Sequence, residues 1–349
     1  MGEVVQDSAD VVGAPVPRPA RQRNALGTAR HGAAVLLRQR EATVFIVVLL
    51  LVLYFWRRTP LFLTHDSLVI ISQTAAPWAI IAIGEVLLLI CGEMDLSVGF
   101  VFTFSPFLMY FLITYYGFPA LAAMVVCLLF GLLVGVVNGV LRVVVGVPAF
   151  ITTLGTGFVL SGITLVTSHA YPELIPASAQ GIGRWLGAAG WAEVIWAIIL
   201  VAVFQIVLTR TRWGLHTIAV GGNPLGAREA GINVARIKIG NFMICSMLGA
   251  FVGLQEMFRA QSIDPHSGDY TPMFFAVAAA VLGGTAMTGG SGSIIGAFFG
   301  ASVLAIVQGG FSLIGISANP LPIIVGGAIL VAMIANVQLE RFRKAGRLT

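Results

Sequence analysis

Apolar residues fill most of the chain in long runs, separated by short polar or glycine- and proline-rich breaks. Residues 42–56 form the first run and Ser67–Cys91 form the second, and polar or charged residues bound both runs. A helix of about 20 apolar residues crosses the hydrocarbon core of a bilayer. These runs do not show the strict alternation of a half-buried strand, so the pattern predicts membrane-spanning helices.

Two charge-free stretches are too long for one helix each. Residues 96–141 break at Tyr115–Pro119, and residues 270–339 break at 283–292 and again at 309–322. Glycine and proline favour turns, so we expect two spans in the first stretch and three in the second. Further apolar runs, at 149–168, 194–208 and 239–256, bring the predicted total to ten transmembrane helices.

Composition supports this prediction. Of the 349 residues, 58% are hydrophobic and 10% are charged, against roughly 45–50% and about 25% in soluble domains. A water-soluble globule is therefore excluded, and we expect an all-α polytopic membrane protein. The three cysteines all lie in apolar runs and form no CxxC pair, so they indicate neither a disulfide framework nor a zinc site.

Basic residues gather in three segments. Six arginines lie in residues 1–41, five lysines or arginines in residues 209–238, and four in the last ten residues. Cytoplasmic loops are enriched in lysine and arginine, and ten spans place all three segments on one face, so both termini are predicted to be cytoplasmic. The predicted organisation is a disordered tail (1–41), a transmembrane domain (42–338) with a cytoplasmic loop at 209–238, and a basic tail (339–349).

Two glycine ladders indicate an internal duplication. Gly131, Gly135 and Gly139 recur every four residues in the fourth span, and Gly292, Gly296 and Gly300 do the same near the ninth. Small residues at this spacing let helix backbones approach closely in a membrane. Spans four and nine occupy equivalent places in two five-helix halves. Because each half has an odd number of spans, the two halves would lie inverted relative to each other in the membrane.

The chain lacks the motifs of several enzyme classes. Neither of its lysines lies in a Gly-Lys-Ser/Thr phosphate-binding loop, and no HExxH or GxSxG pattern occurs. No catalytic residue and no metal ligand set is predicted. The sequence itself therefore indicates neither ATP hydrolysis nor other hydrolytic chemistry by this chain.

Polar groups at membrane depth are the candidates for a substrate pathway. They lie in the second to fifth predicted spans or next to them: Glu85, Glu93, Asp95, Ser97, Asn138, Thr152, Thr153 and Thr156. The uncharged members in the fourth and fifth spans, Asn138 and the three threonines, suit a hydroxyl-rich neutral solute, but serine, threonine and asparagine also bond helix carbonyls. Glu85 has two readings, a pathway acceptor or a structural acid paired within the bundle. Asp95 also has two, a cap of the third span or part of a broken helix beside the pathway.

The 209–238 loop contains a predicted short helix. Asn223 suits its N-cap, Pro224 its first position and Gly231 a left-handed end, which predicts about two turns outside the membrane. This helix presents Arg228 and Glu229. It either docks in a groove of another protein or merely connects two spans.

Three motifs together resemble those of ribose/xylose-type permeases, the membrane subunits of bacterial ATP-binding-cassette importers for monosaccharides. The motifs are Asp95–Gly99, Pro148–Gly155 and Gly221–Asn233, in this order and spacing, and the similarity covers residues 60–336. Glu93 departs from the Gly-Gly-Ile-Asp pattern that is usual in the family, and Glu85 replaces a residue that is commonly uncharged.

The resemblance implies a multi-pass sugar permease of the bacterial plasma (inner) membrane. It pairs with a second copy, identical or not, receives sugar from an extracytoplasmic binding protein and contacts a cytoplasmic ATPase. The ATPase contact is carried by Gly222, Asn223, Pro224, Arg228, Glu229 and Gly231. This chain then binds no cofactor itself, because ATP and magnesium belong to the ATPase subunit, and it binds no nucleic acid. Two alternatives stay open: an ion-coupled secondary transporter using Glu85 or Asp95, and the same importer type carrying a nucleoside or autoinducer-like solute.

Overall fold

The computed structural model describes residues 40–315 and seven separate residues between 323 and 338. Within these residues the chain forms twelve α-helices with short 3-10 and π-helical turns, and one isolated β-bridge joins Glu173 to Ile263. The elements in chain order are α2 (Arg40–Arg58), η1 (Pro60–Leu63), α3 (His65–Ile90), α4 (Val98–Thr114), α5 (Ala120–Val140), η2 (Leu141–Val145), α6 (Ala149–Ser168), η3 (Ala177–Ala179), α7 (Gln180–Gly183), η4 (Arg184–Ala188), α8 (Ala192–Arg210), α9 (Arg212–Gly222), α10 (Pro224–Glu229), α11 (Val234–Ala260), α12 (Thr271–Leu282) and α13 (Ile294–Leu313).

Six of the described helices are long and apolar enough to cross a membrane: α3, α5 with η2, α6, α8, α11 and α13. Two others, α4 and α12, are apolar but shorter, and α2 carries Glu41, Arg57 and Arg58 near its ends. The chain is therefore an all-helical polytopic membrane protein. Each of the first nine predicted spans coincides with a helix, whereas the tenth, residues 1–39 and the C-terminal tail lie outside the continuously described residues. Arg40 and Glu41, which the prediction assigned to the N-terminal tail, are the first residues of α2.

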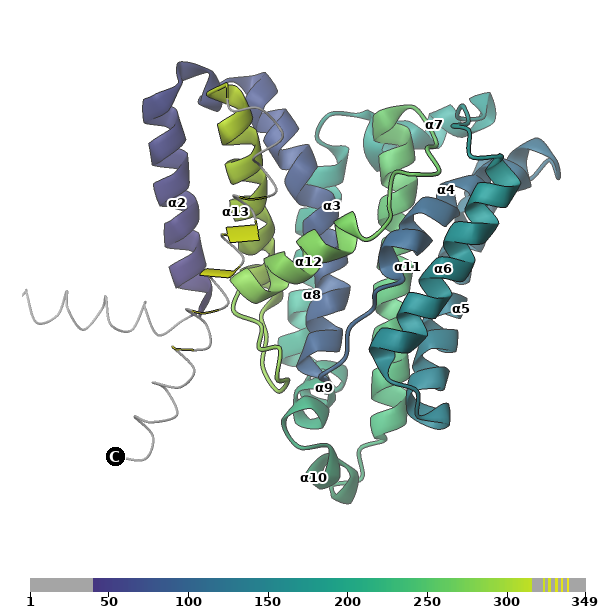
Figure 1. The fold of residues 1–349 in the computed structure, drawn as a ribbon, viewed down its shortest axis with the longest axis vertical. Coiled ribbons are helices and arrows are strands. Elements are labelled where there is room, and N and C mark those ends of the chain that lie inside the picture. Colours follow the sequence, from purple (N-terminus) through teal and green to yellow (C-terminus); the bar gives the residue numbers. More distant parts are fainter. Residues whose placement is uncertain are drawn as a thin grey trace, which may run out of the picture. The chain divides into compact units, whose positions relative to one another are not determined.

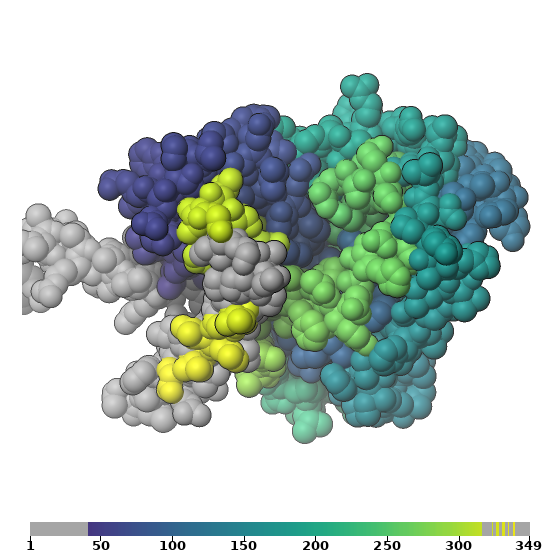
Figure 2. All heavy atoms as spheres, turned by 45° about the horizontal axis from the view of Figure 1, so that its top comes forward, coloured from purple at the N-terminus to yellow at the C-terminus, as the bar shows by residue number. Residues whose placement is uncertain are grey.

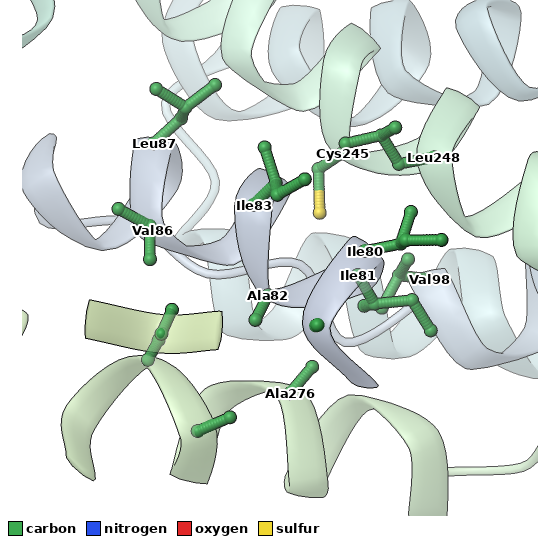
Figure 3. Packing of buried hydrophobic residues seen from close by; sticks show 14 of the residues in the cluster. Ile80, Ile81, Ala82, Ile83, Val86, Leu87, Val98, Cys245, Leu248 and Ala276 are labelled. Carbon is green, nitrogen blue, oxygen red and sulfur yellow. The ribbon is translucent and has the colours of Figure 1, made fainter. Parts of the chain in front are cut away.

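The core is built around α3 and α11. In α3 every side chain from Ala79 to Ile90 is buried, which explains why its apolar residues show no single face. Figure 3 shows Cys245 and Leu248 of α11 on one side of α3 and Ala276 of α12 on the other. By contrast α5, α6 and α8 leave most of their apolar surface uncovered.

Both central helices pack against helices from the other half of the chain. α3 packs against α12 and α13, and α11 packs against α4 and α5. In Figure 1, α2 and α13 lie on one side of α3, α4 to α6 lie beside α11, and α9 and α10 lie together at one end. The two sequence halves therefore interlock in one core.

The glycine ladders lie at these contacts. Gly131, Gly135 and Gly139 face α11 so closely that its atoms occupy the space of a side chain at each position. Gly296 and Gly300 meet the backbone of α12 in the same way. The expected role of the ladders in close helix packing is confirmed for these five glycines.

Three boundaries differ from those expected. α11 begins at Val234, so Val234–Lys238 belong to its first turns and not to the loop, because Asn233 caps the helix by accepting from the Arg236 amide at 2.9 Å. α13 continues through Gly309 and Gly310, and Gly292 precedes it. Charge and glycine content mark where a helix leaves the apolar core, but helix ends are fixed by caps and packing.

Candidate functional site

A non-helical segment, Cys91–Ser97, connects α3 to α4 and carries Asp95 into the core. Asp95 and Ser97 are both fully buried. Of the two readings of Asp95, the cap of α4 is not the one observed, because the N-cap is Ser97, whose side chain forms no capping bond. Asp95 Oδ1 instead accepts from the Ser97 amide at 2.9 Å and from Ser97 Oγ at 2.6 Å, which holds the segment in a turn before the helix.

Asp95 is the centre of a buried hydrogen-bond network that joins four elements. Asn138 of α5 donates to Ser97 Oγ at 2.8 Å and, more distantly, to Asp95 Oδ1 at 3.4 Å. Ser246 of α11 donates to Asp95 Oδ2 at 2.8 Å. Thr156 of α6 donates to Asn138 Oδ1 at 2.8 Å. Both Asp95 oxygens therefore have partners, and the network ties the Cys91–Ser97 segment to α5, α6 and α11.

Four of the five residues in this network were predicted as candidates for the pathway, and the fifth was not. Asp95, Ser97, Asn138 and Thr156 were predicted as polar groups at membrane depth, and the structure brings them into contact. Ser246 was not singled out, because a lone serine in an apolar helix ordinarily bonds its own helix carbonyl. No local pattern marks it, since its partner lies 151 positions away.

Glu93 belongs to a separate ion-pair cluster. Its carboxylate is 3% exposed and accepts from Arg142 Nε at 2.8 Å and from Lys238 Nζ at 2.5 Å. The cluster joins the Cys91–Ser97 segment to the ends of α5 and α11. Two cations thus compensate the one buried anion, which explains how a glutamate is accommodated here.

The remaining predicted pathway residues are not part of the network. Glu85 is fully buried in α3, where Oε1 lies 3.6 Å from Cys245 Sγ and Oε2 has no partner among the described residues. Thr153 donates to the Ala149 carbonyl of its own helix at 2.8 Å. Thr152 Oγ1 is buried without a described partner. Glu93 therefore has partners of its own, whereas Glu85 lies close enough to Asp95 for the two carboxyl groups to interact electrostatically.

The short helix expected in the 209–238 loop is present as α10. Asn223 accepts from the Gly226 amide at 3.0 Å, Pro224 occupies the first helical position, and Gly231 has a φ of 82°. The Ile232 amide donates to the Ala227 carbonyl at 2.9 Å across this left-handed residue. All three predicted signals are confirmed because capping depends only on residues within one turn.

α10 is fixed on one side and free on the other. Ala227 is buried against Cys91, Val220 and Ile237. Leu225 is 71% exposed, and Arg228 and Glu229 are exposed as well. The helix thus presents one apolar and two charged side chains from a packed base.

The base of α10 also contacts the ends of the core elements. Just before α10, Gly221 lies against the Ile90 carbonyl at the end of α3. The amide of Gly290, in the loop before α13, donates to the same carbonyl at 2.8 Å. The residues just before α10 therefore contact the end of α3, where the Cys91–Ser97 segment begins, and this same carbonyl also binds the loop that precedes α13.

Residues for a metal or cofactor do not gather anywhere in the described part of the chain. Within it, no group of three or more His, Cys, Asp or Glu side chains is placed to hold a metal ion. The arrangement offers buried hydrogen bonds and ion pairs that join the helices.

Comparison with known proteins identifies the family. The family described as "Branched-chain amino acid transport system / permease component" matches residues 67–334. A xylose/arabinose import permease of Sulfolobus acidocaldarius is 34% identical over 316 residues, 87% of each chain. A ribose import permease of Escherichia coli K12 is 32% identical over 303 residues, 85% of this chain and 93% of its own length.

A fructose import permease of Rhizobium meliloti is 29% identical over 285 residues, 78% of each chain. No solved structure matches. The family match covers the Asp95 network, the Glu93 ion pairs and α10. The chain therefore belongs to the family of multi-pass membrane permeases of branched-chain amino acid and monosaccharide ATP-binding-cassette transporters, and is a transport component rather than an enzyme.

Proposed function

We propose that this chain is the permease of an ATP-driven importer that moves a monosaccharide or a similar small polyol across the plasma membrane into the cytoplasm. Its relatives over most of the chain are import permeases for xylose/arabinose, ribose and fructose. The structural observation that carries the proposal is α10, with Leu225, Arg228 and Glu229 exposed on a packed base. A short rigid helix of this kind fits a groove on a partner protein.

The proposed topology has ten spans in two inverted halves of five, with both termini in the cytoplasm. The reciprocal packing of α3 with α12 and α13, and of α11 with α4 and α5, supports equivalent roles for α3 and α11 in the two halves. α4 and α12 are then the short, interrupted helices of each half, which is where transporters commonly place polar groups. The tail at 1–41, the loop at 209–238 and the tail at 339–349 complete the proposed cytoplasmic face.

Single cysteines provide a direct test of this topology. Ala177 is exposed at the start of η3 and Leu225 is exposed on α10, at the other end of the helices in Figure 1. We expect a membrane-impermeant maleimide to label Ala177→Cys from outside intact cells and Leu225→Cys only after the cells are opened. The background is low because Cys91, Cys127 and Cys245 are all buried. Labelling of both variants from one side would contradict the inverted arrangement.

The Asp95 network borders the proposed pathway. We propose that Asp95, Ser97 and Asn138 hold the Cys91–Ser97 segment in place, and that Thr152, Thr153 and Thr156 contribute α6 to the pathway wall. Glu93 stabilises the cytoplasmic end through its two cations. Glu85 fills a structural role between α3 and α11.

Three kinds of partner follow from the proposal. A cytoplasmic ATP-binding subunit engages α10 through Gly222–Gly231 and supplies ATP and magnesium. An extracytoplasmic binding protein delivers the sugar, and a second permease copy, identical or related, completes the pathway. In this arrangement hydrolysis moves α10, and the contacts of Gly221 with Ile90 carry the movement to the core.

Reconstituted uptake tests the function. The permease, its ATPase subunit and its binding protein should be incorporated into proteoliposomes and supplied with labelled xylose, arabinose, ribose, fructose or a nucleoside. We expect ATP-dependent uptake of one or more of the sugars. Glu85→Gln should retain uptake within about twofold, because the amide has the same size and keeps an acceptor oxygen.

The ion-coupled alternative makes the opposite prediction. A secondary transporter would accumulate solute with an imposed proton gradient and without the ATPase, and Glu85→Gln would abolish that accumulation. If only the nucleoside is taken up, the chain is still an ATP-driven importer, but its substrate is a nucleoside and not a sugar.

A further inference from the structure

A small open pocket lies between α4, α6 and the loop that connects α11 to α12. Its volume is about 240 Å³, and its polar walls include Thr103, Ser161, Thr164, His266 and Asp269. Figure 1 places this loop at the end of the molecule opposite α10, and Figure 2 shows it lying against α6 on the side that comes forward. The pocket shares no residue with the Asp95 network.

Three of its polar groups have no partner in the described part of the chain. The Ser161 hydroxyl, the His266 ring and the Asp269 carboxylate form no hydrogen bond or ion pair there, whereas Thr103 and Thr164 donate to carbonyls of their own helices at 3.1 and 2.8 Å. The threonine oxygens can still accept. The pocket therefore offers two free donors or acceptors, a carboxylate and two acceptor hydroxyls around one small space.

One wall of the pocket is aromatic. Phe100 lines part of the pocket, is 5% exposed, and packs its ring against Gly157 and, at a centroid distance of 4.8 Å, against Tyr270. Small-molecule sites typically combine such an apolar surface with a few convergent polar groups. The combination suits a compact solute that has both C–H faces and several hydroxyls.

The size and charge of the pocket restrict the solute further. Its volume is below the range of about 300–1,000 Å³ that holds drug-sized ligands, so it fits one small molecule. Asp269 supplies the one carboxylate among the lining residues, and no lysine or arginine lines the pocket. The pocket therefore disfavours anions. A neutral polyol can donate two neighbouring hydroxyls to one carboxylate. In contrast, Asp95 in the buried network already has its acceptor oxygens occupied.

The loop that carries Asp269 is held in position. Asp269 has a φ of 53°, an unfavourable backbone region for most residues, and its carbonyl lies directly against Gly99 of α4. At the other end of the loop, Ile263 exchanges two backbone hydrogen bonds of 2.9 Å with Glu173. The carboxylate is therefore presented from a braced backbone.

We infer that this pocket is an extracytoplasmic binding site for one neutral monosaccharide or similar polyol, contacted by Ser161, His266 and Asp269 beside Phe100. The inference rests on the proposed import function and adds the place where the solute first meets the permease. The Asp95 network then controls the segment beneath the site and does not contact the solute at this stage.

Thiol protection in the reconstituted complex tests the site. Ser161→Cys places a thiol in the pocket, and Thr167→Cys places a matched thiol at an exposed position of the same helix outside it. The three native cysteines are buried and add little background. We expect the transported sugar, present alone in excess, to slow modification of Ser161→Cys by an impermeant maleimide at least threefold. Modification of Thr167→Cys should keep its rate.

A second substitution assigns the protection to the pocket. In the Ser161→Cys background, Asp269→Asn should raise the half-protecting sugar concentration about tenfold, the loss typical of a charged hydrogen bond. Asparagine tolerates the same positive φ, so the loop is retained. Asp66→Asn, at a side chain that is 96% exposed on α3, removes an equal charge and should have no effect.

The outcomes separate this inference from the proposed function. Two results would overturn the binding site without contradicting the import function. One is uptake of a sugar that does not protect Ser161→Cys, and the other is protection that Asp269→Asn leaves unchanged. Absence of uptake of every sugar would overturn the proposed function itself. Equal protection of Thr167→Cys would show that the sugar acts on accessibility in general and would also overturn the site.

Discussion

Replacement of Asp95 by alanine is expected to destabilise the permease more than any other single change in its polar core. The substitution leaves the Ser97 amide, the Ser97 hydroxyl and the Ser246 hydroxyl without their acceptor inside a buried region. Each buried donor that loses its partner costs about 1–3 kcal/mol. We expect a total loss of at least about 3 kcal/mol, which is large against the typical stability of about 5–15 kcal/mol.

Thermal unfolding in detergent measures this loss. A dye that fluoresces on reaction with thiols reports unfolding, because Cys91, Cys127 and Cys245 become accessible only when the core opens. Asp95→Asn retains one acceptor oxygen and should lose clearly less stability than Asp95→Ala. Asp66→Ala, at an exposed carboxylate, should melt like the wild type. An unchanged transition for Asp95→Ala would mean that the network does not stabilise the segment.

Replacement of Gly231 by valine is expected to uncouple ATP hydrolysis from transport. Gly231 has a φ of 82° and nothing within 4 Å of the position of a Cβ, so the change strains only the backbone, by about 1–2 kcal/mol. In a helix of six residues that strain frays the last turn and displaces Arg228 and Glu229. Expression and pairing of the permease should survive, whereas stimulation of the ATPase by the loaded binding protein should be largely lost.

A matched substitution separates loss of coupling from backbone strain. Gly117, between α4 and α5, also has a positive φ, of 66°, and open space around it, and it lies at the end opposite α10. Gly117→Val should therefore retain ATPase stimulation. Arg228→Ala combined with Glu229→Ala should reproduce the loss without straining the backbone, because both side chains are exposed. Intact stimulation in both α10 variants would show that α10 is only a connector.

The positions of the helices could be predicted because the signals are local. A sufficiently long apolar run must be surrounded by lipid or by a protein core, independently of the rest of the chain. This explains why the predicted spans agree with the observed helices α3, α6 and α8. The caps of α10 were predicted for the same reason, since Asn223 and Gly231 act within one turn of the backbone they stabilise. The boundary at Val234 was missed because the charges of Arg236 and Lys238 indicate a loop, although the capping Asn233 is itself a local signal.

The roles of the acidic residues could not be predicted, since a sequence does not show which distant groups surround a carboxylate. Glu93 was expected beside a pathway, but its ion-pair partners Arg142 and Lys238 lie 49 and 145 positions away. Asp95 had two readings, a helix cap or part of a broken helix beside the pathway, and neither indicated its bond to Ser246 of α11. In each case the partner is chosen by helix packing, which brings α5 and α11 to the Cys91–Ser97 segment.

The sequence by itself determined that this protein is a polytopic helical membrane protein with a capped helix outside the apolar spans, because hydrophobicity and capping act over one helix or one turn. Only the tertiary structure decided that Asp95 lies in a closed network, that Glu93 is ion-paired, and that Ser161 and Asp269 share an open pocket. The reason is physical: the interaction of a polar group in an apolar core depends on the few partners within hydrogen-bond reach, and long-range packing selects those partners.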